Sequence, residues 1–199
     1  MKMKKLVFNC KFITEVVLNA NTATEGSQTV LDYIPGSNFL GIIAKEYSTL
    51  GNDKAYQLFH SGNVQFGDGH IIIDTGNNKT RSLKTPFAWY TKKALNNSGQ
   101  QEYYVHHKIS DEIKKTQQLK QEREGFFIVE NNIIYQTLLE NNYHQKSAQE
   151  RLTRRSANEK MFGYEALNSG TEWQFFIHIK GNKNNRQNKL TSQFIILSI

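Results

Sequence analysis

The stretch Leu31-Asp-Tyr-Ile-Pro-Gly-Ser-Asn-Phe-Leu-Gly-Ile-Ile-Ala-Lys-Glu-Tyr47 turns an extended segment into a helix within a few residues. Pro35 disfavours helical backbone in the residue before it, so the preceding residues are predicted to be extended. Pro35-Gly36 is a turn pair. Ser37 or Asn38 can accept a hydrogen bond from the free amides of the first helical turn. Apolar residues then follow at helical spacing, which predicts a helix from about Ser37 to Leu50.

The start of this predicted helix has two interpretations. A glycine-containing turn into a helix N-terminus exposes backbone N–H groups and the positive end of the helix dipole, which suits a phosphate or another anion. An ordinary capped helix start has the same sequence pattern and is more frequent. The turn alone does not decide between them, so the rest of the chain has to be considered.

Composition narrows the class of protein. The chain has 199 residues, a formal net charge of +7 and 38% hydrophobic residues, with a pI near 9.4. A basic balance of this kind suggests a polyanionic partner. The sequence contains no apolar run of the ~18 residues that a membrane span needs and no cleavable signal, so we expect a cytoplasmic protein with no membrane partner. The single cysteine, Cys10, excludes an internal disulfide and a cysteine metal site.

Strand and helix patterns alternate along the chain, without internal repeats and without a linker that would divide it. Strands are predicted at Lys4–Leu18, 63–66, 70–73, 125–129, 133–135 and 172–179, with a further short strand at 161–162 and 164–167. The strands 125–129 and 133–135 flank Glu130-Asn-Asn132 and predict a hairpin, and turns are predicted at 67–69 and 74–78. A second longer helix is predicted at 110–124, with Ser110 or Asp111 as its cap. This order predicts an α+β fold with a ferredoxin-like (RRM-like) core carrying insertions. We expect a single domain over residues 1–199. Because Leu190–Ile199 is apolar to its last residue, we also expect this domain to be the N-terminal part of a longer protein.

Catalytic and metal-binding motifs are weak in this sequence. The histidines are isolated, or adjacent as in His106-His107, and their spacing does not suit a metal site. The sequence contains no Gly-x-Ser-x-Gly or Cys–His nucleophile motif. It also lacks the Walker A phosphate-binding loop of P-loop nucleoside triphosphatases. We therefore expect no cofactor and no metal. A histidine such as His144 could act as a general base in RNA cleavage, although an ordinary surface histidine has the same signature.

Basic residues form three clusters, and these give the stronger signal. The first lies at 146–160, the second at 180–189, and the third at 79–84 directly before the aromatic residues Phe87, Trp89 and Tyr90. The clusters consist of Lys146, Arg151, Arg154, Arg155 and Lys160; of Lys180, Lys183, Arg186 and Lys189; and of Lys79, Arg81 and Lys84. Cations beside aromatic rings suit RNA, because guanidinium groups bind phosphates and rings stack on bases. A solvated basic face would have the same composition.

Four segments in order resemble the RAMP superfamily of CRISPR effector subunits. Tyr33-Ile-Pro-Gly-Ser-Asn-Phe-Leu-Gly41 is similar to its Pro-Gly-Ser signature, with Leu40 where a basic residue often stands. The segments 58–69, 81–89 and 144–167 are similar to motifs of the type III subunit that caps the 5′ handle of the guide RNA, in its subtype III-D form. In the last of these, His144, Arg151, Tyr164 and Glu165 match the family's motif, whereas Arg154 replaces its glycine.

The resemblance implies a non-catalytic subunit of a type III CRISPR ribonucleoprotein that serves in antiviral defence. Its partners would be the guide RNA (crRNA), held by its 5′ handle, and other effector subunits. The residues expected to contact RNA are Gly36, Ser37, Arg81, Lys84, Trp89, His144, Arg151, Arg154 and Arg155.

Two other hypotheses remain open. The first is a RAMP-type endoribonuclease, which would process guide RNA with His144 or cut target RNA with an acid such as Glu25 or Asp32. The second is a basic α+β binding protein with no role in RNA binding.

Overall fold

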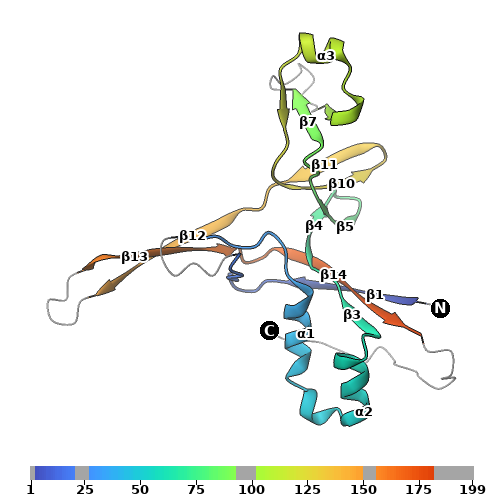
Figure 1. Ribbon diagram of the computed structural model, residues 1–199, viewed down its shortest axis with the longest axis vertical. Coiled ribbons are helices and arrows are strands. Elements are labelled where there is room, and N and C mark those ends of the chain that lie inside the picture. The colour runs from blue at the N-terminus through green and yellow to red at the C-terminus, as the bar shows by residue number, and fades with distance from the viewer. Residues whose placement is uncertain (1–2, 21–26, 93–101, 150–155, 182–199) are drawn as a thin grey trace. The chain divides into compact units, whose positions relative to one another are not determined.

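The computed structural model describes residues 3–20, 27–92, 102–149 and 156–181 (Figure 1). They belong to two compact units, the first built from residues 1–72 together with 140–199, and the second from residues 73–139. The sequence does not predict this division, because neither boundary coincides with a linker. The expected mixture of helices and mostly antiparallel sheets is confirmed, so the fold class is α+β.

The first unit is organised around β14 (Glu172–Lys180), which has a strand on each side. Strand β1 (Met3–Lys11) pairs with it antiparallel, from Met3↔Lys180 to Lys11↔Glu172. On the other edge, β3 (Val64–Phe66) and β4 (His70–Asp74) also pair with it antiparallel. Strand β1 is therefore parallel to β3 and β4. In the chain, helix segments separate β1 from β3, and in the sheet β14 lies between β1 and these two strands. This is the split β-α-β arrangement of a ferredoxin-like core.

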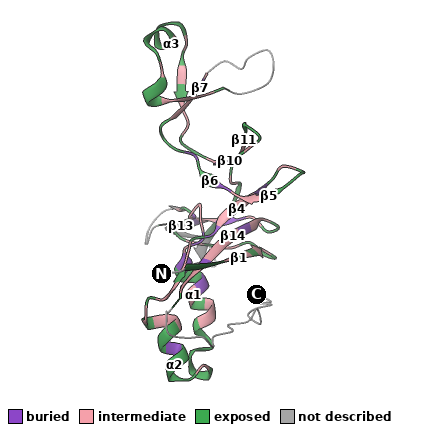
Figure 2. Cartoon of the chain, turned by 90° about the vertical axis from the view of Figure 1, so that its right-hand side faces the viewer, coloured by how far each residue is buried: buried purple, intermediate pink, exposed green. Residues whose placement is uncertain are grey.

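Aromatic side chains fix α1 (Gly36–Ala44) on one face of this sheet. Phe39 of the helix stacks on Phe175 of β14 with ring centroids 3.7 Å apart, and Phe8 of β1 stacks on Phe175 at 5.3 Å. Next along β14 on the same face, Trp173 is completely buried, and its indole N–H donates to Thr171 Oγ1 at 2.9 Å. The core of this unit therefore lies between α1 and the helix-covered side of the sheet (Figure 2).

The predicted helix 37–50 is shorter in the structure, and its cap is different. Helix α1 ends at Ala44 and is followed by the 3-10 turn η1 (Tyr47–Thr49), by α2 (Asn52–Ala55) and by the π-helical turn η2 (Tyr56–His60). Pro35 occupies the N-cap position, so the prediction that Ser37 or Asn38 caps the helix is wrong. The Asp68 carboxylate accepts the hydrogen bond of the first helical amide instead.

A long polar hairpin completes the described part of the first unit. Strands β12 (Asn141–Gln149) and β13 (Ser156–Leu167) pair antiparallel, and β2 (Ser27–Gln28) joins β13 in parallel. The sequence predicted only a short strand in this region, at its apolar end. Polar strands of a two-stranded ribbon lack the apolar alternation that marks a half-buried strand, so the pattern gave no signal for the remainder.

The second unit consists of two small sheets and a hairpin turn. One sheet has the order β11 (Ile133–Thr137), β10 (Phe126–Glu130) and β6 (Leu83–Lys84); the other has the order β8 (Tyr103–Val105), β7 (Trp89–Lys92) and β9 (Leu119–Gln121). The predicted hairpin at 125–135 is confirmed, since Asn131 and Asn132 take the positive φ angles of a two-residue turn. The predicted helix 110–124 is only α3 (Asp111–Thr116), which Ser110 caps as expected and which follows the 3-10 turn η3 (His106–Lys108).

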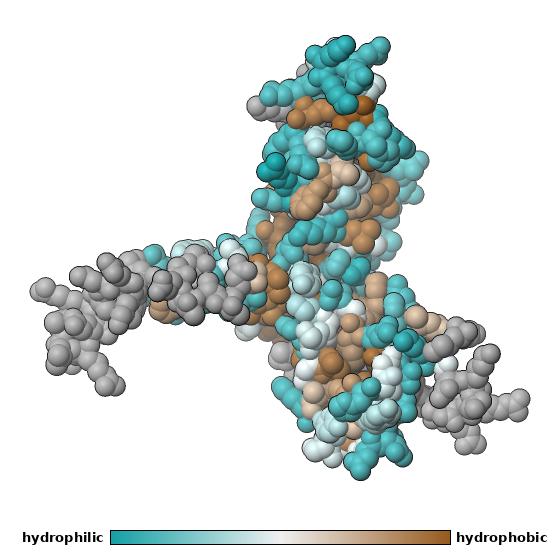
Figure 3. Space-filling view, viewed as in Figure 1, coloured by the Kyte–Doolittle hydropathy of each residue, from teal (hydrophilic) through white to brown (hydrophobic). Residues whose placement is uncertain are grey.

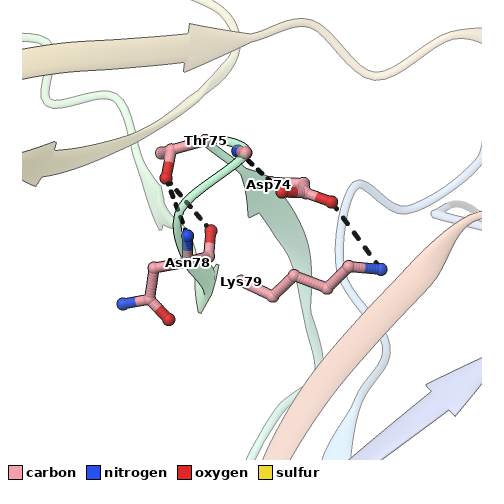
Figure 4. Close-up of polar contacts among 5 residues, drawn as sticks. Asp74, Thr75, Asn78 and Lys79 are labelled. Atoms are coloured by element: carbon pink, nitrogen blue, oxygen red, sulfur yellow. Dashed lines mark hydrogen bonds and ion pairs between the residues drawn. The ribbon is translucent and has the colours of Figure 1, made fainter.

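The turn between β4 and β5 (Lys79–Arg81) is held by its own side chains, as Figure 4 shows. The Thr75 amide donates to the Asn78 carbonyl at 3.0 Å, and the Gly76 amide donates to Asp74 Oδ1 at 2.9 Å. Gly76 has a φ of +83°, which favours glycine. The Lys79 ammonium lies 3.8 Å from Asp74 Oδ2. The turn predicted at 74–78 is therefore confirmed.

Candidate nucleic-acid interface

The strongest cluster of predicted site residues lies on the hairpin β12–β13. His144 belongs to β12, and the segment 150–155 joins β12 to β13. Three of the predicted contacts, Arg151, Arg154 and Arg155, lie outside the described residues. In the sequence, these arginines fall between the last residue of β12, Gln149, and the first residue of β13, Ser156.

His144 contacts a carboxylate at the edge of its ring and an aromatic ring at its face. Its Nε2 lies 2.7 Å from Glu15 Oε2, and its ring stacks on Tyr164 of β13 with centroids 5.2 Å apart. Asn142 Nδ2 donates to the other oxygen of the Glu15 carboxylate. Hydrogen bonds from Asn142 and then from His144 lower the pKa of Glu15. An ionised Glu15 therefore fixes the orientation of the imidazole.

His144 has cationic and aromatic neighbours on the same face of the hairpin. Side chains two residues apart on a strand share a face, so Lys146 lies on the side of His144. The register pairs His144 with Tyr164 and Lys146 with Phe162. Lys146 is exposed, and Phe162 is 50% exposed. We call these four residues the hairpin face; it combines an ammonium that can bind phosphate with rings that can stack on bases.

The turn at the start of α1 is already occupied by an anionic group of the chain. The Gly36 amide donates to Asp68 Oδ1 at 2.8 Å. Ser37 is exposed beside it. A phosphate could bind the Gly36 amide only by displacing this carboxylate, so RNA contacts at Gly36 and Ser37 stay predictions. Sequence reasoning treated Gly67-Asp68-Gly69 as a simple turn and missed the role of Asp68.

The predicted contacts of the second unit have different environments. Trp89 packs against Phe127 with ring centroids 4.4 Å apart and against Tyr103 at 5.3 Å, so its ring is part of that unit's core. Arg81 is half-buried, whereas Lys84 is exposed. Phe87, two residues before Trp89, is 62% exposed and is the more accessible ring of that segment.

Three further properties of the described ranges concern metal ligands, helix hydropathy and the cysteine thiol. No group of three or more His, Cys, Asp or Glu side chains there could hold a metal ion. None of the helices in those ranges is long and apolar enough to cross a membrane. Burial raises the pKa of the Cys10 thiol to about 11, which keeps it protonated and unreactive near neutral pH.

Glu15 is the residue of the hairpin cluster that sequence reasoning missed. It lies in the predicted strand 4–18, whose paired part ends at Lys11 as β1. The chain then leaves the sheet and forms an isolated bridge between Val16 and Leu167 of β13. That bridge carries Glu15 to the hairpin, 129 residues away in sequence from His144. A single acid in a strand-like segment gives no sequence signal for such a contact.

Comparisons with known proteins find similarity in structure and not in sequence. No family model matches the sequence, and no curated protein is similar to it at a significant level. A chain of the cryo-EM structure of the type III-B Cmr-beta bound to cognate target RNA superposes with a TM-score of 0.48 and 11% sequence identity. The match covers 90% of this chain and 85% of that chain.

Proposed function

We propose that this protein is a non-catalytic RNA-binding subunit of a type III CRISPR ribonucleoprotein and holds the 5′ handle of the guide RNA. The observation that carries the proposal is the hairpin face, in which His144, Lys146, Phe162 and Tyr164 stand together on the ribbon that leads into Arg151, Arg154 and Arg155. The same segment, 144–167, carries part of the sequence resemblance to the handle-capping subunits of RAMP proteins.

The mechanism follows from the chemistry of these side chains. The arginines and Lys146 neutralise phosphates, which supplies most of the affinity for RNA and makes it salt-dependent. Phe162 is exposed and Tyr164 is half-exposed, so an unstacked base can lie against this part of the ribbon. The imidazole of His144, oriented by Glu15, offers a hydrogen bond of fixed direction beside that base. The partners would be crRNA and the neighbouring effector subunits.

Replacing Arg154 and Arg155 together by alanine tests the proposal. We expect weaker binding of a repeat-derived RNA and a smaller salt slope, by about 0.7 for each lost contact to a single-stranded phosphate. Filter binding at several salt concentrations measures both quantities. The control replaces Lys114 and Lys115 of α3 by alanine, because this variant loses the same net charge far from the hairpin in sequence. Equal affinity and slope in both variants would contradict the proposal.

A metal-independent endoribonuclease is the second candidate function, and the Glu15–His144 pair favours it. A carboxylate that orients an imidazole is the arrangement expected for a general base, which would here activate a ribose 2′-hydroxyl. Incubation of the purified protein with repeat RNA separates the two functions. Cleavage by the wild-type protein that is lost in both His144→Ala and Glu15→Gln would favour the endoribonuclease over the non-catalytic subunit. Intact RNA after incubation would exclude endoribonuclease activity on that substrate.

A further inference from the structure

The sheet of the first unit has a second face, opposite α1, that carries its own set of chemical groups. Residues on β1 alternate: Leu6, Phe8 and Cys10 are half-buried, whereas the residues between them are exposed. Because β1 and β14 are in direct register, the exposed β1 residues share a face with alternate residues of β14. We call this surface the open face; it consists of Met3, Lys5, Val7, Asn9 and Lys11 of β1 and Glu172, Gln174, Phe176, His178 and Lys180 of β14.

The centre of the open face is aromatic and apolar. Phe176 lies on β14, the strand that has partners on both edges. Val7 is its register partner and is 55% exposed. The Lys5 ammonium lies 3.5 Å from the centroid of the Phe176 ring, a cation–π contact on the solvent side of the sheet. An aromatic ring on a central strand, flanked by an exposed aliphatic group, is a stacking platform for a nucleobase.

The charge of the open face is positive. Lys5, Lys11 and Lys180 belong to it, and among the described residues of β1 and β14 the one acid on this face is Glu172, at its end beside Lys11. The Gln174 amide donates to Asn9 Oδ1 at 2.9 Å. These two polar side chains, which can bind base edges, lie between the Phe176 ring and the Glu172 end of the face. Figure 3 shows hydrophilic and hydrophobic residues interleaved over the region of α1 and α2, which belongs to the other side of the sheet.

From this arrangement we propose that the open face binds single-stranded RNA, with a base stacked over Phe176 and Val7 and the lysines on the neighbouring phosphates. Charge complementarity selects RNA over a protein partner, because Lys5 lies over the ring, Lys11 and Lys180 lie at the two ends of the face, and Glu172 is its one acid on β1 and β14. The Lys5 side chain is long and flexible, so its ammonium can leave the ring for a phosphate. This inference rests on the proposed RNA-binding function and adds a second contact surface on elements other than the hairpin.

Two neighbouring lysines of β1 provide a matched test. Lys5 lies on the open face, whereas Lys4 is exposed and points to the opposite side of the same strand. Lys5→Glu and Lys4→Glu therefore change the net charge equally. We expect Lys5→Glu to weaken the binding of a guide-strand RNA to the full chain about tenfold and Lys4→Glu to change it less than twofold, measured by fluorescence anisotropy. Phe176→Leu keeps an apolar side chain, and we expect about fivefold weaker binding because the stacking ring is lost.

The outcomes separate the open face from the proposed function. If the wild-type chain binds no RNA, the proposed function fails. If the wild-type chain binds and the two lysine variants have equal affinities, the inference about the open face is overturned while the proposed function stands. If Lys5→Glu leaves RNA affinity unchanged but abolishes co-purification with effector subunits, the face is a protein interface and the inference is also overturned. Melting curves of Lys5→Glu, Lys4→Glu and Phe176→Leu are compared first, to show that the variants fold. A second measurement needs no variant: RNA containing 4-thiouridine should form a zero-length photocrosslink to the 173–180 peptide of the wild-type chain, and absence of this crosslink would overturn the inference.

Discussion

Gly36→Ala should destabilise the first unit because two stretches of backbone meet at Gly36. A Cβ at this position would lie 2.3 Å from the carbonyl oxygen of Phe66 and 2.8 Å from its carbonyl carbon, where ordinary contacts begin at 3.4 Å. Neither atom can rotate away, since both belong to the backbone of β3. Helix α1 and β3 would have to separate by about 1 Å, and overpacking of this kind costs about 1–3 kcal/mol of unfolding free energy.

The same helix supplies the control. A Cβ at Gly41 would meet nothing within 4 Å, and that residue is exposed in the middle of α1. Alanine is favoured over glycine inside a helix by about 0.5–1 kcal/mol, so Gly41→Ala should stabilise the protein. The two variants carry the same chemical change and should therefore differ in unfolding free energy by at least about 1.5 kcal/mol.

Urea denaturation measures this difference if the signal reports the first unit alone. The chain has two tryptophans, and Trp89→Phe leaves Trp173, which is completely buried on β14. In that background, the midpoint of the Trp173 fluorescence transition should fall for Gly36→Ala and rise for Gly41→Ala. Equal midpoints for the two variants would refute the close approach of α1 and β3, and with it the structural reason for glycine in the Pro35-Gly36 turn.

Two further predictions concern carboxylates of the first unit. Asp68→Ala removes the acceptor of the first α1 amide and should cost about 1 kcal/mol, as the loss of a helix cap does; an unchanged urea midpoint would contradict it. Asn142 and His144 lower the pKa of Glu15, so its ionised form stabilises the fold above the ordinary pKa of 4.5, and this contribution is lost as the pH falls through the lowered value. The difference in stability between wild type and Glu15→Gln should therefore be present at pH 6 and vanish in strong acid, whereas a pH-independent difference would show that ionisation is not its source.

Local sequence patterns were sufficient for elements that are stabilised by their own residues. The hairpin at 125–135 has its turn asparagines between two apolar runs, and the Ser110 cap precedes a charged helical segment. Patterns failed where a distant partner decides the conformation. Helix α3 ends at Thr116, where the sequence predicts more helix, because the chain continues into β9, which pairs with β7 through Tyr90, Thr91 and Lys92. Pairing with a remote strand outweighs local helix propensity there.

The same distinction separates the candidate site residues that the sequence predicts from those that only the strand register brings together. Arg151, Arg154, Arg155 and His144 were predicted because a run of basic residues and a family motif are properties of one segment. Glu15 and the open face were not, because each depends on a register between strands that lie far apart in the sequence. On β1 alone, Lys5 and Lys4 are two similar basic residues. Pairing with β14 places Lys5 over the Phe176 ring and Lys4 on the opposite side of the strand. Replacing each lysine in turn therefore separates the effect of the open face on RNA affinity from the effect of net charge.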